Sequence, residues 1–151
     1  MMEDRFTRGF LAGSIGGIAS TAVDIPLYLL KIASYRLIDY GAVFIYGYLP
    51  KTFFETFFAL LIHWGFAAFG GGMFVYLVRF IAEKNFIFKG WLFGIGIWFT
   101  VYLLAFFFKV PHFTITPFPT VLTNFVASST YGIIMALTFL FWESKLPEAH
   151  Q

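Results

Sequence analysis

The sequence predicts an all-α fold, a bundle of four membrane-spanning helices that forms one domain over residues 1–151. Hydrophobic residues make up 60% of the chain and charged residues 12%, and the mean hydropathy is +0.81. These values lie outside the range of soluble domains. The 23 phenylalanines carry more apolar surface than one water-soluble core of this size could bury. A bilayer core about 30 Å thick takes roughly 20 apolar helical residues to cross, and four segments meet this requirement: residues 9–30, 56–78, 90–108 and 121–142.

The first predicted span carries small residues on one face. Gly9, Gly13 and Gly17 repeat at a spacing of four, which lets two membrane helices approach closely. Steps of three and four continue this face to Asp24. We therefore expect Asp24 to point into the bundle.

Pro26 follows Asp24 in the same span. Proline removes the amide that would bond the carbonyl of Ala22, and its ring clashes there, so a kink is expected. Either Thr21 or a neighbouring helix should then bond the freed carbonyl.

The start of the chain also has features of a secretory signal peptide, because Arg5 and Arg8 precede an apolar run. That run continues to Leu30, which is longer than a signal core. A retained first span is therefore the favoured interpretation.

The segments between the spans differ in character. Residues 31–55 are too polar to cross a membrane but rich in Tyr, Phe and Ile, which predicts an interfacial segment. Residues 79–89 form a short basic connection. Residues 109–120 contain Pro111, Pro117 and Pro119, which predict an ordered, non-helical connection.

The second span carries His63, the one histidine inside a predicted span. It lies seven residues after Thr56, and Asp24 lies seven before Lys31, so at ~1.5 Å per residue both are roughly 10 Å deep. Other polar residues fall near this level. The predicted polar layer comprises Asp24, His63, Thr100, Asn124, Ser128 and Tyr131, and the predicted packing positions are Gly9, Gly13, Gly17, Pro26, Gly70, Gly71 and Gly72.

Two interpretations of this layer stay open. Ionisable residues inside a membrane cost about 2.5–3.5 kcal/mol each and often mark a proton or ion pathway. An Asp24–His63 pair could share a proton. The alternative is that the layer only joins the helices, through interhelical hydrogen bonds that contribute about 0.6 kcal/mol each.

The sequence lacks the residues that several functional classes require. The chain has no cysteine, which excludes disulfides and thiolate metal sites. A single histidine in the spans gives neither zinc-ligand spacing nor two haem ligands, so no metal and no cofactor are expected. The glycine runs lack the strand and lysine of a phosphate loop. The net charge is +2 and the basic residues are scattered, so nucleic acid is not an expected partner.

The positions of Lys and Arg predict the orientation. Six flank one side of the predicted spans and four the other, which favours both termini in the cytoplasm of a bacterial cell. The first set is Arg5, Arg8, Arg79, Lys84, Lys89 and Lys145, and the second is Lys31, Arg36, Lys51 and Lys109.

Residues 89–143 resemble the C-terminal half of the YqhR-type conserved membrane proteins of bacteria. The resemblance rests on a Gly-rich helix that opens with Gly90, Trp91 and Leu92, a proline-containing turn, and a last helix with Tyr131 and Gly132. It implies a four-span membrane protein and brings no catalytic residues. The small-residue first span is also similar to that of YagU-type inner-membrane proteins.

The leading hypothesis is a non-enzymatic multi-pass protein of the bacterial cytoplasmic membrane that acts as a structural or partner-binding component. It would contact lipid and either a second copy or another membrane protein. The alternative is a small oligomeric proton-linked transporter or channel that uses Asp24 and His63. A membrane enzyme acting on a lipid or quinone would need a cluster of acids that the sequence does not contain.

Overall fold

The computed structural model describes residues 4–81 and 84–145 and is all-α, which confirms the predicted fold class. Four of its helices are long and apolar enough to cross a membrane. A shorter helix, α2, lies between the first two spans. The helices are α1 (Arg5–Leu29), α2 (Leu37–Tyr46), α3 (Phe53–Ile81), α4 (Phe86–Phe107) and α5 (Phe118–Glu143).

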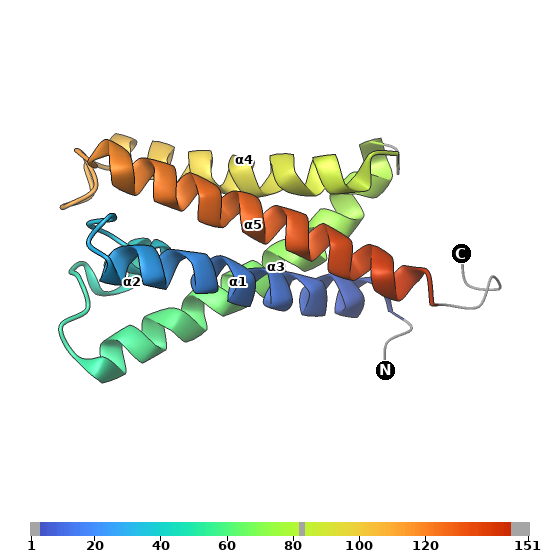
Figure 1. Cartoon of the computed structure of the whole chain (residues 1–151), viewed down its shortest axis with the longest axis horizontal. Coiled ribbons are helices and arrows are strands. Elements are labelled where there is room, and N and C mark those ends of the chain that lie inside the picture. The colour runs from blue at the N-terminus through green and yellow to red at the C-terminus, as the bar shows by residue number, and fades with distance from the viewer. Residues whose placement is uncertain (1–3, 82–83, 146–151) are drawn as a thin grey trace.

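Helix α1 packs against both α3 and α5 (Figure 1). Helix α4 packs along α5 and touches α3 very little, because α3 crosses obliquely and meets α4 near the connection between them. The start of α1 and the end of α5 lie at one end of the bundle, called here the terminal end. Helix α2 lies at the other, the α2 end.

Glycines set the distance between α1 and α3. A Cβ built at Gly9 would lie 2.7 Å from the carbonyl oxygen of Gly71, and one at Gly17 would lie 2.7 Å from the Cβ of Ala67. Between them, a Cβ at Gly13 would lie 2.9 Å from the Cα of Gly71. The two helices therefore approach closely over about two turns, as small residues allow in membrane helices.

The neighbouring glycines of α3 face other elements. A Cβ at Gly70 would lie 2.8 Å from the Tyr131 hydroxyl of α5, and one at Gly72 would collide with the ring of Phe6. A second close contact joins α4 to α5, where Gly90 and Gly94 meet the backbone around Gly132.

Helices α1 and α3 begin earlier than the sequence predicted, because their capping side chains lie outside the apolar runs. At α1, Asp4 Oδ2 accepts hydrogen bonds from the backbone N–H of Thr7 at 2.9 Å and from its hydroxyl at 3.0 Å. At α3, Thr52 and Glu55 each accept a hydrogen bond from the other's backbone N–H, at 3.2 Å in both cases. This reciprocal arrangement is a capping box.

One predicted detail of the prolines is corrected. Pro119 belongs to the first turn of α5, where its missing N–H would have no intrahelical partner, and not to a non-helical connection. Helix α1 continues through Pro26 to Leu29. The hydroxyl of Thr21 donates to the carbonyl of Gly17 at 2.9 Å, so it does not serve the freed carbonyl of Ala22.

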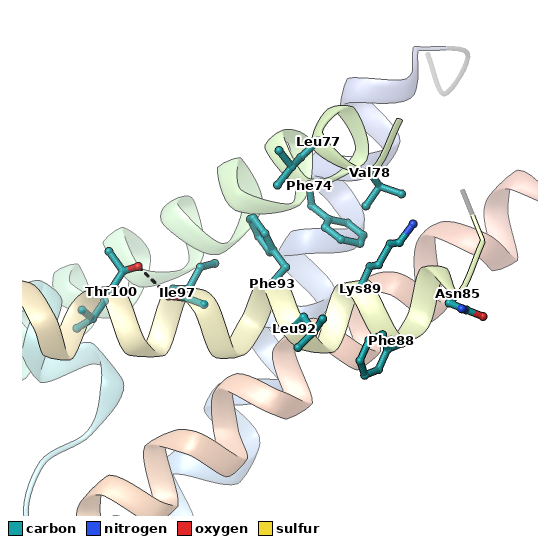
Figure 2. A pocket seen from close by; sticks show the side chains of 12 residues that line it. Phe74, Leu77, Val78, Asn85, Phe88, Lys89, Leu92, Phe93, Ile97 and Thr100 are labelled. Atoms are coloured by element: carbon teal, nitrogen blue, oxygen red, sulfur yellow. Dashed lines mark hydrogen bonds between the residues drawn. The ribbon is translucent and has the colours of Figure 1, made fainter. Parts of the chain in front are cut away.

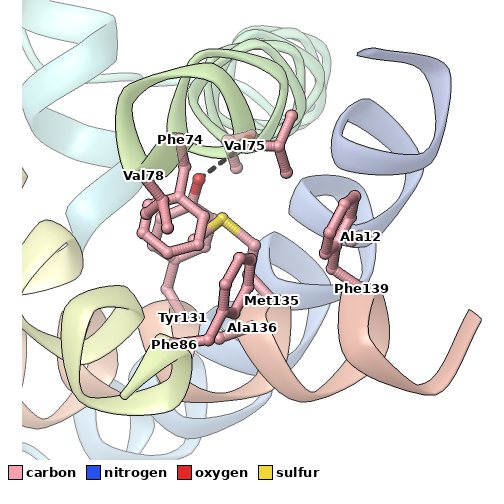
Figure 3. Close-up of a cluster of buried hydrophobic side chains, with 10 residues drawn as sticks. Ala12, Phe74, Val75, Val78, Phe86, Tyr131, Met135, Ala136 and Phe139 are labelled. Carbon is pink, nitrogen blue, oxygen red and sulfur yellow. Dashed lines mark hydrogen bonds between the residues drawn. The ribbon is translucent and has the colours of Figure 1, made fainter. Parts of the chain in front are cut away.

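The larger apolar core lies toward the terminal end (Figure 3). Phe86 stacks on Phe139 with ring centroids 5.3 Å apart and meets Phe74 edge-on at 5.0 Å. Val75 and Met135 are fully buried beside them. The polar side chains described next lie toward the α2 end.

Candidate functional site

Asp24 connects α1 to α2. Its side chain is 1% exposed, and Oδ2 accepts a hydrogen bond from the backbone N–H of Leu37 at 2.7 Å. Leu37 is the first residue of α2, where the backbone amides have no carbonyl partner within the helix. Asp24 therefore caps a helix other than its own.

A second carboxylate binds the preceding amide of α2. Asp39 Oδ2 accepts from the backbone N–H of Arg36 at 2.7 Å, and Asp39 Oδ1 lies 2.7 Å from Arg36 Nη2 in an ion pair. Asp39 is 3% exposed. The guanidinium of Arg36 is thus paired with the carboxylate of Asp39.

Three aromatic residues and an asparagine contact one another at the α2 end. Asn124 Nδ2 donates to the Tyr102 hydroxyl at 3.0 Å. The rings of Tyr40 and Tyr102 are 5.3 Å apart, and Tyr40 also stacks on Phe113 at 3.9 Å. Burial raises the pKa of the Tyr40 hydroxyl far above its ordinary value, so this side chain stays neutral. Asp24 lies close enough to Tyr102 for the two to interact electrostatically.

We call Asp24, Tyr40, Tyr102 and Asn124 the α2-end cluster. Three of its polar atoms are buried and have no hydrogen-bond partner in the described part of the chain. They are Asp24 Oδ1, the Tyr40 hydroxyl and Asn124 Oδ1, on residues that are 1%, 2% and 0% exposed. Native interiors rarely leave such atoms unpaired, so the cluster is the main candidate for a ligand site.

His63 lies apart from this cluster. Its buried Nε2 atom has no hydrogen-bond partner, and no hydrogen bond or ion pair among the described residues joins His63 to Asp24. The adjacent Trp64 instead contacts α1, where its indole N–H donates to the Thr21 hydroxyl at 3.1 Å.

The other residues of the predicted layer occupy separate places. The exposed Thr100 bonds the carbonyl of Gly96 in its own helix at 2.8 Å. Ser128 is buried where α5 meets Gly94. The Tyr131 hydroxyl donates to the carbonyl of Ala67 at 2.7 Å and joins α5 to α3. Of the six residues, the structure brings Asp24 and Asn124 into one cluster.

Tyr40 and Tyr102 were missed by the sequence analysis. Tyr40 lies in the segment interpreted as interfacial, where tyrosine is expected at the headgroups. The signal that could have located it is the acidic residue Asp39 three positions after Arg36, because a carboxylate there often caps a helix. A helix from Leu37 turns Ile38, Ala42 and Val43 inward beside Tyr40.

A groove of about 740 Å³ separates α3 from α4 (Figure 2). Phe74 of α3 and Phe93 of α4 meet across it, with ring centroids 5.3 Å apart. Asn85 and Lys89 lie toward its terminal end, and Thr100 lies toward the α2 end. The remaining lining residues are apolar: Phe74, Leu77, Val78, Phe88, Leu92, Phe93, Gly96, Ile97 and Val101.

Gly96 faces open space in this groove. A Cβ built there meets nothing within 4 Å, whereas the other two glycines of α4, Gly90 and Gly94, both contact α5. Gly65 of α3 is equally open but does not line the groove.

The comparisons with known proteins give no relative. No family model matches the chain, and neither a curated protein nor a solved structure is significantly similar to it. Its four candidate spans define the class, a multi-pass helical membrane protein in contact with bilayer lipid. The resemblance of residues 89–143 to the YqhR-type proteins stays a prediction.

Proposed function

We propose that this protein is a non-enzymatic, partner-binding component of the bacterial cytoplasmic membrane, with both termini in the cytoplasm. The partner is a transmembrane helix, from a second copy or from another membrane protein, that packs into the groove between α3 and α4. The observation that carries the proposal is the groove itself, which lies between two spans.

The shape and chemistry of the groove suit a helix. Gly96 and Thr100 are small residues four apart that line the groove, the spacing at which membrane helices approach most closely. The walls are apolar over most of their length, which fits the side of a membrane helix better than a water-soluble solute. The α1–α3 and α4–α5 pairs already use glycine in this way.

The proton-linked transporter has less support. That hypothesis rests on Asp24 and His63 acting as a pair, and Asp24 bonds the backbone of Leu37 instead. One oxygen of Asp24 therefore has a structural task at the start of α2.

Photo-crosslinking in native membranes tests the partner-binding proposal. A photoreactive phenylalanine analogue is placed at Leu92, which lines the groove, or at Phe66, which is 72% exposed and lies outside it. We expect one discrete protein product from position 92 and none from position 66. Its mass distinguishes a second copy from another protein.

Paired substitutions make this test specific. Gly96→Leu fills the groove and should lower the yield of the product roughly fivefold or more, because the partner loses its close approach. Gly65→Leu is the matched control and should leave the yield unchanged, since both glycines have free space around them. The absence of a discrete product at position 92, or an equal loss in the two variants, would contradict the proposal.

A further inference from the structure

We propose that the α2-end cluster binds a small monovalent cation of the sodium class, with Asp24 Oδ1, Asn124 Oδ1 and the Tyr40 hydroxyl as ligands. This site is separate from the α3–α4 groove and does not depend on a partner helix.

Two acceptor oxygens of the cluster, and the Tyr40 hydroxyl, which can donate as well as accept, have no hydrogen-bond partner in the described part of the chain. Asp24 Oδ2 is occupied by the Leu37 amide, and Asn124 Nδ2 is occupied by the Tyr102 hydroxyl. The atoms that remain, Asp24 Oδ1 and Asn124 Oδ1, can only accept when Asp24 is ionised, and both are buried without a partner. Such a pair of oxygens needs a donor or a cation between them.

Interactions with Tyr102 connect the three residues that carry these atoms. Its hydroxyl is bonded to Asn124, its ring lies 5.3 Å from that of Tyr40, and it interacts electrostatically with Asp24. The Tyr40 hydroxyl interacts with that of Tyr102, yet no group in the described part of the chain meets it in hydrogen-bond geometry. One residue each of α1, α2 and α5 thereby interacts with the same residue of α4.

The charges around Asp24 favour a cation over a neutral ligand. The charged groups that act on it are Arg36 and Asp39. Arg36 is bonded to Asp39 at 2.7 Å and lies over the ring of Tyr28 at 4.7 Å, so these two charges offset each other. From α4 and α5 the cluster presents the neutral side chains of Tyr102 and Asn124. The carboxyl of Asp24 has no counterion of its own, so it is neutralised either by a proton or by a bound cation.

The type of ligand sets the type of cation. One carboxylate oxygen, one amide oxygen and one phenol oxygen are hard donors with a total charge of −1, which a single monovalent cation neutralises. Calcium takes six to eight oxygens, and several carboxylates in its tighter sites. A buried water could bond the same acceptors but would leave the charge uncompensated. The test distinguishes the two.

The test uses the full-length protein in detergent and in lipid nanodiscs, with chloride salts of sodium, potassium, lithium and choline at constant ionic strength. A cation that binds the folded protein alone raises the unfolding temperature in a saturable, concentration-dependent way. We expect this response to sodium and not to choline. Equilibrium binding of radioactive sodium ions should saturate at one ion per chain.

Three variants assign the site. Asp24→Asn keeps an oxygen for the Leu37 amide but removes the charge, and should abolish sodium binding. Tyr40→Phe keeps the stacked ring and should weaken binding about tenfold, because one oxygen ligand is lost. Asp4→Asn changes the carboxylate that caps α1 at the terminal end and should leave sodium binding unchanged.

The proposal is overturned if the wild type shows no difference between sodium and choline, which would leave a buried water as the occupant. It is overturned also if the protein responds to pH alone and to no alkali cation, or if Asp24→Asn and Tyr40→Phe both bind sodium like the wild type. Should Asp24→Asn fail to fold, Tyr40→Phe decides the outcome.

Discussion

The two sides of this bundle use the same residue type to opposite effect. Where α1 meets α3, an added Cβ at Gly9, Gly13 or Gly71 would collide with the facing backbone. On the side of α4 that faces α3, Gly96 is surrounded by empty space. Buried residues make up 17% of the most apolar stretch of α4, against 39% in each of the other three spans. A membrane helix glycine therefore marks either a completed contact or a vacant one, and the neighbouring atoms decide which.

The largest expected effect separates these two sides directly. Gly71→Leu forces side-chain atoms into the backbone of α1 at Gly9 and Gly13, and overpacking of this kind should destabilise the protein by about 3 kcal/mol or more. Gly96→Leu introduces the same side chain into open space and should change stability by less than about 0.5 kcal/mol. Tryptophan fluorescence during unfolding in detergent measures both. Equal losses would show that the groove is closed in the native membrane protein.

A smaller effect is expected from removing one hydroxyl on each side. Tyr131→Phe deletes the donor to the Ala67 carbonyl, which joins α5 to α3 at 2.7 Å, and should cost about 0.6–1.5 kcal/mol. Thr100→Val deletes a hydroxyl that bonds only the carbonyl of its own helix at Gly96. This change should cost less than about 0.5 kcal/mol. If Thr100→Val is the more damaging, then α4 makes an interaction beyond the single chain.

The smallest expected effect lies at the terminal end, outside the membrane. The hydrogen bonds that Asp4 accepts from Thr7 lower its pKa below the ordinary value of 3.8. A carboxylate with a lowered pKa stabilises the folded state at pH above that ordinary value, and this contribution is lost as the pH falls through the lowered pKa. In Asp4→Asn this part of the acid dependence should be absent. The measurement is the difference in free energy of unfolding between wild type and variant, followed by fluorescence from pH 6 down to about pH 3. The same acid dependence in both proteins would contradict the assignment.

The fold could be predicted from the sequence because a helix that spans lipid must have an apolar composition. Long apolar runs with glycine at every fourth position leave few alternatives to packed spanning helices. The helix ends were less accessible, since Asp4, Thr52 and Pro119 cap or open helices from outside the apolar runs. The apolar runs stop short of those residues, although each helix starts at or next to one of them.

The candidate site was predictable only in part. Steps along α1 correctly turned Asp24 inward, where it is 1% exposed. Depth in the membrane then suggested His63 as its partner, but equal depth does not fix the angle between two helices around the bundle. The partner that the structure supplies, the Leu37 amide, belongs to a helix that the sequence analysis treated only as an interfacial segment. The role of Tyr40 could not be predicted for the same reason.

The position of α2 has a consequence for the order in which the chain assembles. Its first amide is held by Asp24, which is made before it, but Tyr40 stacks on Phe113 and lies beside Tyr102, both of which are synthesised much later. The surface against which α2 packs is therefore incomplete until α4 and the connection after it have been inserted. The time at which α2 becomes protected from protease would therefore report when membrane insertion is complete.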